Sequence, residues 1–583
     1  LPLTINGKID KRALPDPEMQ DALSNEFVAP RNELEEKLAE IWKTLLGIKQ
    51  VGINDNFFEL GGDSILTIQV VSRAKRFGYN LQPKDIFIHQ TIKKLSQAVS
   101  QRAEAIVSGE QGFLTGEAKL LPVQQWYLEN EQTHVSHFNQ KLFLKIDKGI
   151  TESLLSNVIE QLSKHHDALR FIYSRKENGW RQEYGTAIPK VVVEKIDGAN
   201  LNQNSFLITQ LADKYQQSLN IEEGDLVRVV LMQTPDADTH NRLLIVIHHL
   251  AVDGVSWRIL VEDMEELLNG AIAGNAIDFG HKTSSYRQWY EALEKYSQSE
   301  RLLSQKKYWK NAAADYEDLN TDTEYDEPIR LKDVSKVEIL LDAEQTLQLL
   351  QEVPRAYHTE INDILLSALA KTFFEWNKTN KIVIGLEGHG REEIDNNIDI
   401  SKTVGWFTSM YPLLLESKAS DSGLDNLIKS VKEQLRLVPD KGLGYGVLKY
   451  INKEESLHDA KPFEIVFNYL GQTDNVVKES KWFSGVQESA GEGRSEELIV
   501  TEKLFVNSIV SGGKLKLTWL YSTKHFMEDT IKDLSAAYIA NLESLIDHCL
   551  HQQKGGETYT PSDYGLGEEI SFEELDQFLN ERF

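Results

Sequence analysis

The sequence has almost no cysteine: Cys549 is the single thiol in 583 residues. One thiol cannot form an internal disulfide, and nothing around it suggests a thiolate metal cluster. The N-terminus also lacks the apolar core of a signal peptide, because charges begin at Lys8. These absences predict a protein of a reducing compartment, which we expect to be the cytoplasm.

Basic residues are scarce relative to acidic ones, with 63 Lys and Arg against 90 Asp and Glu and a net charge of -27. Phosphate contacts need a basic surface, so we expect no nucleic-acid partner. Long hydrophobic runs are missing too. The longest apolar stretch, LLIVIHHLAV, contains two histidines and is too short to span a bilayer, so we expect no membrane partner.

The composition is otherwise that of a globular protein, with 41% hydrophobic and 26% charged residues. A chain of this length is too long to fold around a single hydrophobic core, so we predict two to four domains. Residues 1–28 are polar and contain three prolines, so they are interpreted as a tail and linker. Residues 29–105 then show helical spacing of apolar residues and predict a small helical domain.

Cap signals delimit the helices of this small domain. Asn32 followed by Glu35 predicts the start of a first helix, and Gly47 its end. Ser64 opens a second helix, whose apolar face is predicted to be Ile65, Ile68 and Val71. A bundle this small has little room for an internal active site.

The rest of the chain alternates short β-rich runs with helical stretches, which is typical of an α/β or α+β fold. Residues 106–117 are interpreted as a mobile linker. A charged region near 291 divides the remainder into two predicted lobes, 118–290 and 291–555. Residues 556–583 are interpreted as a tail, polar at first and then a short amphipathic helix from Ser571, which typically docks on a partner.

Ser64 stands in the string DNFFELGGDSI, and two interpretations fit it. A lone serine before a helix is most simply an N-cap. Alternatively it is an attachment point, because Gly61 and Gly62 leave the backbone open and a helix N-terminus favours an attached phosphodiester.

A second constellation is HHLAVDGVSW, residues 248–257. In a strand, His248 and His249 point to opposite faces, which disfavours a shared metal ion, so we predict no metal site. One of them can be a core residue. The other, before a turn with Asp253, can be an acid/base group that titrates near neutral pH.

A third constellation is GLEGHGRE, residues 385–392. Glu387 follows the apolar run KIVIGL, and a glutamate between glycines is often only a turn residue. A carboxylate at such an edge can instead have a raised pKa and act as a base. The second and third constellations each follow an apolar strand, one in each predicted lobe. We expect the two strand ends to contribute their ionisable groups to one shared site.

The string around Ser64 resembles the peptidyl carrier domains of non-ribosomal peptide synthetases. In that family the serine of GG-x-S carries 4'-phosphopantetheine, so the resemblance assigns this cofactor to Ser64 and implies a phosphopantetheinyl transferase as a partner. Asp63 replaces the usual histidine, as carriers that precede an epimerization domain tend to show. The N-terminal LPLTINGKIDKRAL resembles the last motif of adenylation domains, which implies an upstream adenylation domain.

The strings HHLAVDGVSW and EGHGRE, together with HFNQ, TVGWFTSMYP and FNYLGQ, resemble the motifs of epimerization domains in family order. The resemblance implies a two-lobed fold like that of chloramphenicol acetyltransferase. It also implies catalytic roles for His249 and Glu387 and a mainly structural role for Asp253. Asn468 and Tyr469 are candidates to line the site.

The implied function is L-to-D epimerization of an aminoacyl thioester, with phenylalanine as the cargo by analogy with similar initiation modules. The implied downstream partner is the condensation domain of the next synthetase, which the C-terminal helix would dock. Two alternatives remain. One is a condensation domain, which shares the HHxxxDG motif, and the other is a non-catalytic carrier and docking scaffold.

Overall fold

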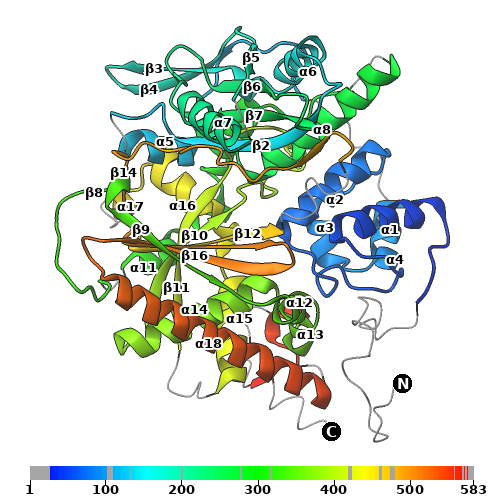
Figure 1. The fold of residues 1–583 in the computed structure, drawn as a ribbon. Helices are drawn as coiled ribbons and strands as arrows, with labels where there is room; N and C mark the ends of the chain where they lie inside the picture. Colours follow the sequence, from blue (N-terminus) through cyan, green and yellow to red (C-terminus); the bar gives the residue numbers. More distant parts are fainter. Residues whose placement is uncertain are drawn as a thin grey trace, which may run out of the picture.

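The computed structural model describes residues 27–100, 109–130, 133–198, 201–275, 279–314, 318–417, 423–458, 463–472, 480–556, 558–566, 570 and 574–575. Lys8 and nearly all of the predicted C-terminal helix lie outside these residues. Among the described helices, none combines the length and apolar character that crossing a bilayer requires. Figure 1 shows a small helical domain beside two larger lobes, each built around its own sheet.

The small domain is helical, as predicted, and contains four helices. They are α1 (Glu33–Leu46), α2 (Ser64–Arg76), α3 (Pro83–Ile88) and α4 (Ile92–Ser100). Asn32 caps α1 by accepting from the backbone N–H of Glu35, and Gly47 ends it in the left-handed conformation at φ 66°. The bundle has its own apolar core around Trp42 and Phe57, whose ring centroids lie 4.9 Å apart.

The start of α2 corrects one prediction. Asp63, not Ser64, is the N-cap, because its Oδ1 accepts from the backbone N–H groups of Ile65 and Leu66 at 2.9 and 2.8 Å. Asp and Ser are comparably good N-cap residues, so the sequence alone could not decide which of the two begins the helix. Ser64 therefore occupies the first helical position, and its side chain is not needed to cap the helix.

The first lobe contains a five-stranded sheet in the order β13-β2-β7-β6-β5 and a three-stranded sheet in the order β1-β4-β3. Its strands are β1 (Gly116–Glu117), β2 (Asn139–Asp147), β3 (Phe171–Lys176), β4 (Gly179–Tyr184), β5 (Val191–Lys195), β6 (Val227–Gln233), β7 (His240–His248) and β13 (Phe483–Gly485). Its helices are α5 (Pro122–Asn130), α6 (Glu152–His165), α7 (Leu201–Gln216) and α8 (Gly254–Ala273).

The second lobe contains a six-stranded mixed sheet in the order β11-β10-β12-β15-β16-β9 and a two-stranded sheet, β14-β8. Its strands are β8 (Ile329–Arg330), β9 (Val334–Leu340), β10 (Lys381–Gly388), β11 (Ser409–Glu416), β12 (Ile465–Gln472), β14 (Ile499–Val500), β15 (Leu504–Ser511) and β16 (Lys514–Ser522). Helices α9 (Tyr286–Tyr296), α10 (Glu300–Leu303) and α11 (Lys306–Ala314) precede it. The remaining helices are α12 (Ala343–Gln351), α13 (Val353–Tyr357), α14 (Ile361–Asn377), α15 (Leu424–Arg436), α16 (Leu443–Gly446), α17 (Glu455–His458) and α18 (Glu528–Gln552).

One segment crosses between the lobes. Residues 480–498, here called the bridging segment, follow β12 in sequence but supply β13, which pairs antiparallel with β2 of the first lobe. The backbone N–H of Asn139 donates to the carbonyl of Gly493 at 2.7 Å, and Ser495 N–H donates to the carbonyl of His137 at 3.0 Å. The two sheets are therefore joined by chain pairing as well as by a shared core.

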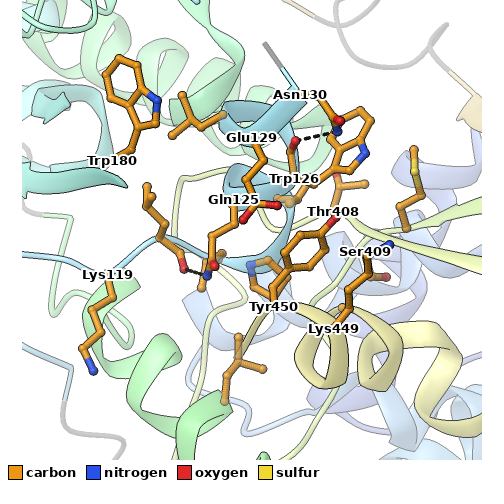
Figure 2. A pocket seen from close by; sticks show the side chains of 18 of the residues that line it. Lys119, Gln125, Trp126, Glu129, Asn130, Trp180, Thr408, Ser409, Lys449 and Tyr450 are labelled. Carbon is orange, nitrogen blue, oxygen red and sulfur yellow. Dashed lines mark hydrogen bonds between the residues drawn. The ribbon is translucent and has the colours of Figure 1, made fainter. Parts of the chain in front are cut away.

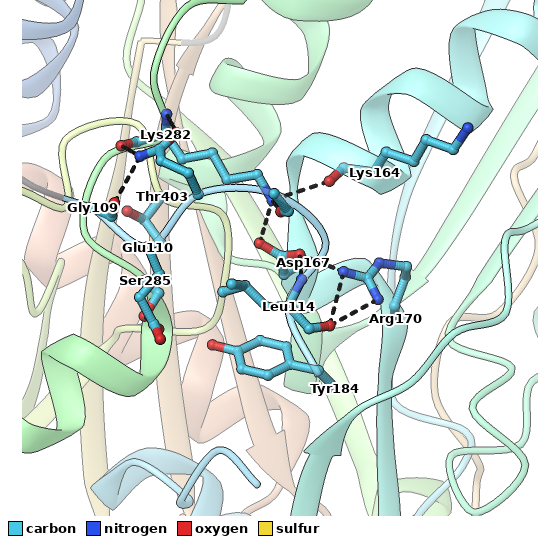
Figure 3. Close-up of polar contacts among 12 residues, drawn as sticks. Gly109, Glu110, Leu114, Lys164, Asp167, Arg170, Tyr184, Lys282, Ser285 and Thr403 are labelled. Carbon is cyan, nitrogen blue, oxygen red and sulfur yellow. Dashed lines mark hydrogen bonds and ion pairs between the residues drawn. The ribbon is translucent and has the colours of Figure 1, made fainter. Parts of the chain in front are cut away.

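Residues 109–118, here called the strap, are anchored to the first lobe (Figure 3). Glu110 forms an ion pair with Arg287 at 2.7 Å and accepts from the Ser285 hydroxyl at 2.5 Å. The backbone N–H of Leu114 donates to Asp167 at 3.2 Å. The prediction of a mobile linker is therefore wrong for residues 109–117. The other predicted linker residues, 106–108, lie outside the described residues.

Residues 558–566, which the sequence places in the tail, pack on the second lobe. Asp563 accepts from the buried ammonium of Lys432 at 2.7 Å, and this ammonium also donates to the carbonyl of Tyr357 at 2.8 Å. The Ser562 hydroxyl donates to Glu433 at 2.6 Å. This stretch is thus a fixed part of the lobe and not a free tether.

Candidate functional site

His249 lies at the end of β7, where the strand turns into a short 3-10 helix (His249–Ala251). Its ring stacks on Phe138, with centroids 5.0 Å apart, and lies 4.2 Å from the Trp406 ring. Its Nδ1 donates to the carbonyl of Val252 at 2.9 Å, so Nε2 is the acceptor and receives the Gln140 amide at 2.9 Å. Burial lowers the pKa of His249 to about 4, and the imidazole is neutral at pH 7.

His248 has the structural role that the sequence analysis left open for one of the two histidines. It is fully buried, its Nε2 donates to the carbonyl of Val135 at 2.7 Å, and its Nδ1 accepts from the backbone N–H of Leu250 at 3.2 Å. Burial lowers its pKa to about 3. Because both ring nitrogens are used internally, His248 is unavailable for proton transfer.

Asp253 joins the two motif regions. Its side chain caps α8 by accepting a hydrogen bond from the backbone N–H of Ser256 at 2.7 Å. It also accepts hydrogen bonds from residues across the junction between the lobes. Arg391, from the EGHGRE string, donates to both of its oxygens at 3.2 Å, and the backbone N–H of Phe407 donates at 3.1 Å. This buried pair fixes the loop after β10 against the start of α8.

Glu387 lies near the end of β10, where it pairs with Met410 of β11. The amide of Asn468, on the neighbouring strand β12, donates to Glu387 Oε2 at 2.6 Å. Burial raises the pKa of Glu387 to about 7, the charge of Glu502 raises it further, and Arg494 opposes both. A carboxyl group with this pKa exchanges its proton near neutral pH.

Tyr469 lies elsewhere than predicted. Its hydroxyl is buried and has no hydrogen-bond partner among the described residues, and the charges that act on its pKa are those of Asp63 and Arg258. Tyr469 therefore faces the four-helix bundle rather than Glu387. Successive residues of a strand point to opposite sides, which explains why Asn468 and Tyr469 separate.

Two residues near the pair escaped the sequence analysis: Arg494 of the bridging segment and Glu502 before β15. The positive charge of Arg494 lowers the pKa of both His249 and Glu387, which places it within electrostatic range of both. Burial raises the pKa of Glu502. Neither residue belongs to a recognisable string, and only the pairing of residues 137–139 with 493–495 brings Arg494 to the site.

A cavity of about 920 Å³ opens between the lobes. Helices α5 and α16, which contribute to its lining, lie on the side away from the four-helix bundle in Figure 1. Figure 2 shows α5 contributing Trp126 and Glu129, and Thr408, Ser409 and Tyr450 lying across from them. Glu502 is among the lining residues, so the cavity reaches the neighbourhood of Glu387.

The four-helix bundle docks on the two lobes through α2. The amide of Gln472 donates to the carbonyl of Gly61 at 2.9 Å, at the glycine loop before Ser64. A row of ion pairs flanks this contact: Arg73–Glu262 at 2.9 Å, Arg76–Asp263 at 2.8 Å, Lys75–Asp399 at 2.6 Å and Lys84–Glu393 at 2.6 Å. In a chain of net charge -27, a basic face on the bundle meets acidic side chains of the lobes.

The apolar face of α2 is divided between two cores. Val71 packs inside the bundle as predicted, but Ile68 belongs to the core of the large lobes and Ile65 packs against that core. The helix therefore carries more apolar surface than its own bundle needs, and the surplus forms the docking contact.

Ser64 fits the attachment of a phosphodiester. Its hydroxyl takes part in no hydrogen bond to a described residue, and it begins a helix of 13 residues whose N-terminus favours negative charge. A Cβ on Gly62 would approach Phe57 to 2.4 Å, so only glycine allows this loop to fold so tightly before the serine. The buried guanidinium of Arg258 also lies near, because a Cβ built on Gly471 would meet Asp63 Oδ2 at 3.3 Å and Arg258 Nη2 at 3.4 Å.

Two protein families match this chain. Residues 36–99 match the phosphopantetheine attachment site family, and residues 115–564 match the condensation domain family. The first match covers Ser64 and shows that the bundle is a carrier with 4'-phosphopantetheine bound covalently to a serine, as expected from the sequence.

The relatives are very long synthetases. The chain is 39% identical over 579 residues to bacitracin synthase 3 of Bacillus licheniformis, covering 99% of this chain and 9% of that protein. It is 38% identical over 604 residues to gramicidin S synthase 1 of Brevibacillus brevis, covering 100% of this chain and 53% of that protein. The chain thus spans only part of the relatives that it matches.

The solved structures agree on the fold. The epimerization domain from the third module of tyrocidine synthetase B superposes with a TM-score of 0.70 at 34% identity, covering 76% of this chain and 99% of that one. The condensation domain from the Monacolin K polyketide synthase superposes with a TM-score of 0.59 at 14% identity, covering 75% of this chain and 98% of that one. The predicted two-lobed fold is confirmed.

Proposed function

Because this chain belongs to the condensation-domain family of non-ribosomal peptide synthetases and carries its own phosphopantetheine carrier, we propose that it epimerizes an aminoacyl group tethered to Ser64. One observation carries the proposal. Glu387, a carboxyl group with a pKa of about 7, and His249, a neutral imidazole, both lie within range of the charge of Arg494.

Phosphopantetheine supplies a thioester, whose carbonyl makes the α-proton of the cargo more acidic. The chain must then remove a proton from one face of the α-carbon and deliver one to the other face. With the pKa of His249 at about 4 and that of Glu387 at about 7, the pair holds one proton between these pH values, on Glu387. For the enantiomer whose α-proton faces the imidazole, the unprotonated Nε2 of His249 removes this proton, and the protonated Glu387 delivers a proton to the opposite face.

In the reverse direction the single proton of the pair is on His249. Ionised Glu387 then acts as the base and protonated His249 as the acid. The surrounding residues support both states. Asn468 stabilises the ionised carboxylate by donating to it, and the Val252 carbonyl holds Nδ1–H so that Nε2 exchanges the proton. Acid–base assistance of this kind contributes about 10²–10⁴-fold to a rate.

The alternative of a condensation domain requires no second titrating group opposite the histidine. The raised pKa of Glu387 and its bond to Asn468 favour epimerization, and they also count against a non-catalytic scaffold. The proposed cargo is phenylalanine. The proposed partners are an upstream adenylation domain, a phosphopantetheinyl transferase and the condensation domain of a following synthetase.

The test uses the chain loaded at Ser64 with L-phenylalanyl-pantetheine by a phosphopantetheinyl transferase. We expect D-phenylalanine after hydrolysis and deuterium at the α-carbon in heavy water, both lost in His249→Ala and Glu387→Gln. Ser64→Ala should show no added mass on loading. A wild-type chain that loads but yields only L-phenylalanine without exchange would refute the proposal.

A further inference from the structure

The bridging segment holds Arg494 in a fixed place beside His249. Arg494 pairs with Phe138 across an isolated antiparallel bridge, and hydrogen bonds of its two neighbours, Gly493 and Ser495, flank this bridge. A Cβ on Gly493 would lie 2.8 Å from the carbonyl oxygen of Asn139, so the two backbones approach as closely as glycine allows. The position of Arg494 is thus set by backbone pairing and not by its side chain.

The side chain of Arg494 lies against the same aromatic ring as the catalytic histidine. Its guanidinium carbon is 4.9 Å from the Phe138 centroid, and the His249 centroid is 5.0 Å from it. No hydrogen bond or ion pair to a described residue engages this guanidinium, although Glu387 and Glu502 are near enough to act on its pKa. A guanidinium that rests on an aromatic ring and has no hydrogen-bonded or ion-paired partner among the described residues is able to donate to an anion that forms only during a reaction.

Such an anion forms in the proposed epimerization. When a base takes the α-proton, the electron pair of the C–H bond moves toward the carbonyl carbon, and the thioester oxygen becomes negative. When the acid delivers a proton to the opposite face, the electron pair returns and the oxygen becomes neutral again. The proton count balances, since one C–H bond breaks and one forms.

We propose that Arg494 is a catalytic residue that donates hydrogen bonds to the thioester oxygen as its negative charge develops. This inference rests on the proposed function. The charges of Glu387 and Glu502 both raise the pKa of Arg494, and neither carboxyl group forms an ion pair with its guanidinium. Removal of an oxyanion donor typically lowers a rate by about 10²–10³-fold.

The decisive variants are Arg494→Gln, which removes the charge, and Arg494→Lys, which keeps the charge but loses the planar fork of donors. We expect the α-proton exchange rate of the loaded chain to fall about 10²–10³-fold in Arg494→Gln. We expect Arg494→Lys to recover only part of it. Lys195→Gln removes an exposed positive charge at the end of β5; it is the matched control and should leave the rate unchanged.

A second measurement separates direct contact from a change in the pKa values of the pair. The charged and titratable groups that act on this site are Arg494, Glu502, Glu387, His249, Asp253, Lys141 and Tyr127. Because Arg494 lowers the pKa of His249, NMR titration of the unloaded Arg494→Gln variant should show that pKa raised, which verifies the placement of the guanidinium. If the pH–rate profile of Arg494→Gln only shifts and keeps the wild-type maximum, Arg494 is not the oxyanion donor.

A backbone variant tests the same point without touching the arginine. Gly493→Ala should displace Arg494 and lower the exchange rate at least tenfold, whereas Gly485→Ala in the same segment meets no atom within 4 Å and should have no effect. Wild-type rates in both Arg494→Gln and Gly493→Ala would overturn the inference. A wild-type chain that does not epimerize would instead overturn the proposed function.

Discussion

At the scale of single residues, the proposed epimerization predicts a pH range that is set by the proton shared by Glu387 and His249. Both directions need the pair to hold one proton, which it does between the pKa of about 4 and the pKa of about 7. The apparent values belong to the pair and not to either residue alone.

We therefore expect a bell-shaped profile of single-turnover epimerization, falling below about pH 4 and again above about pH 7. Quenched-flow measurement with the loaded chain across this range checks it. A mechanism in which ionised Glu387 alone serves both faces predicts the opposite, a rate that rises through pH 7.

The same carboxyl group makes stability depend on pH. The pKa of Glu387 rises from 4.5 to about 7 on folding, so the folded state binds more protons between these values and stability falls as pH increases through them. We expect Glu387→Gln to be more stable than wild type at pH 8, by up to about 3 kcal/mol, and equal to it at pH 4. Urea unfolding at both pH values measures this, and a constant difference would contradict it.

At the scale of elements, α2 acts as the contact helix of the carrier. Its start, to within one residue, and its apolar face were readable from the sequence, because cap residues and apolar spacing are local signals. That Ile65 and Ile68 face a second domain was not readable, since the periodicity shows an apolar face but not what covers it. The same holds for Arg494, because its place depends on the pairing of segments about 350 residues apart.

The ion pairs around α2 predict a charge-exchange experiment. Lys84→Glu should reduce the docked fraction of the carrier about 2–5-fold, and adding Glu393→Lys should restore it. Energy transfer between dyes on the carrier and on α18 reports the docked fraction. Lys94→Glu, at an exposed position of α4, is the control, and failure of the double variant to recover would argue against this docking geometry.

At the scale of the whole molecule, the end of the fold lies later than the sequence indicated. Turn-rich composition suggested a free tail from residue 556, but composition cannot reveal that Asp563 neutralises the buried Lys432. By contrast, the fold class and the phosphopantetheine cofactor followed from motifs, whose residues are close together in the sequence.

Truncation distinguishes the two parts of this region. A chain that ends at Leu566 should keep its stability and epimerize, and it should lose transfer to the following synthetase if the C-terminal segment docks there. A chain that ends at Gly556 leaves Lys432 buried without its carboxylate and should lose about 3–5 kcal/mol of stability. Urea unfolding and product transfer assays report on the two effects, and equal stability would show that Asp563 is dispensable.

The anchored strap also determines how tightly the carrier needs to bind. With the chain fixed again at Gly109, the residues after Ser100 allow the carrier a radius of at most about 30 Å. Within such a volume the carrier's local concentration is of millimolar order. Docking through a few apolar side chains and ion pairs can therefore have a low intrinsic affinity, and the docked state can still be frequently populated. Weak docking also lets the carrier leave quickly for the partners proposed above.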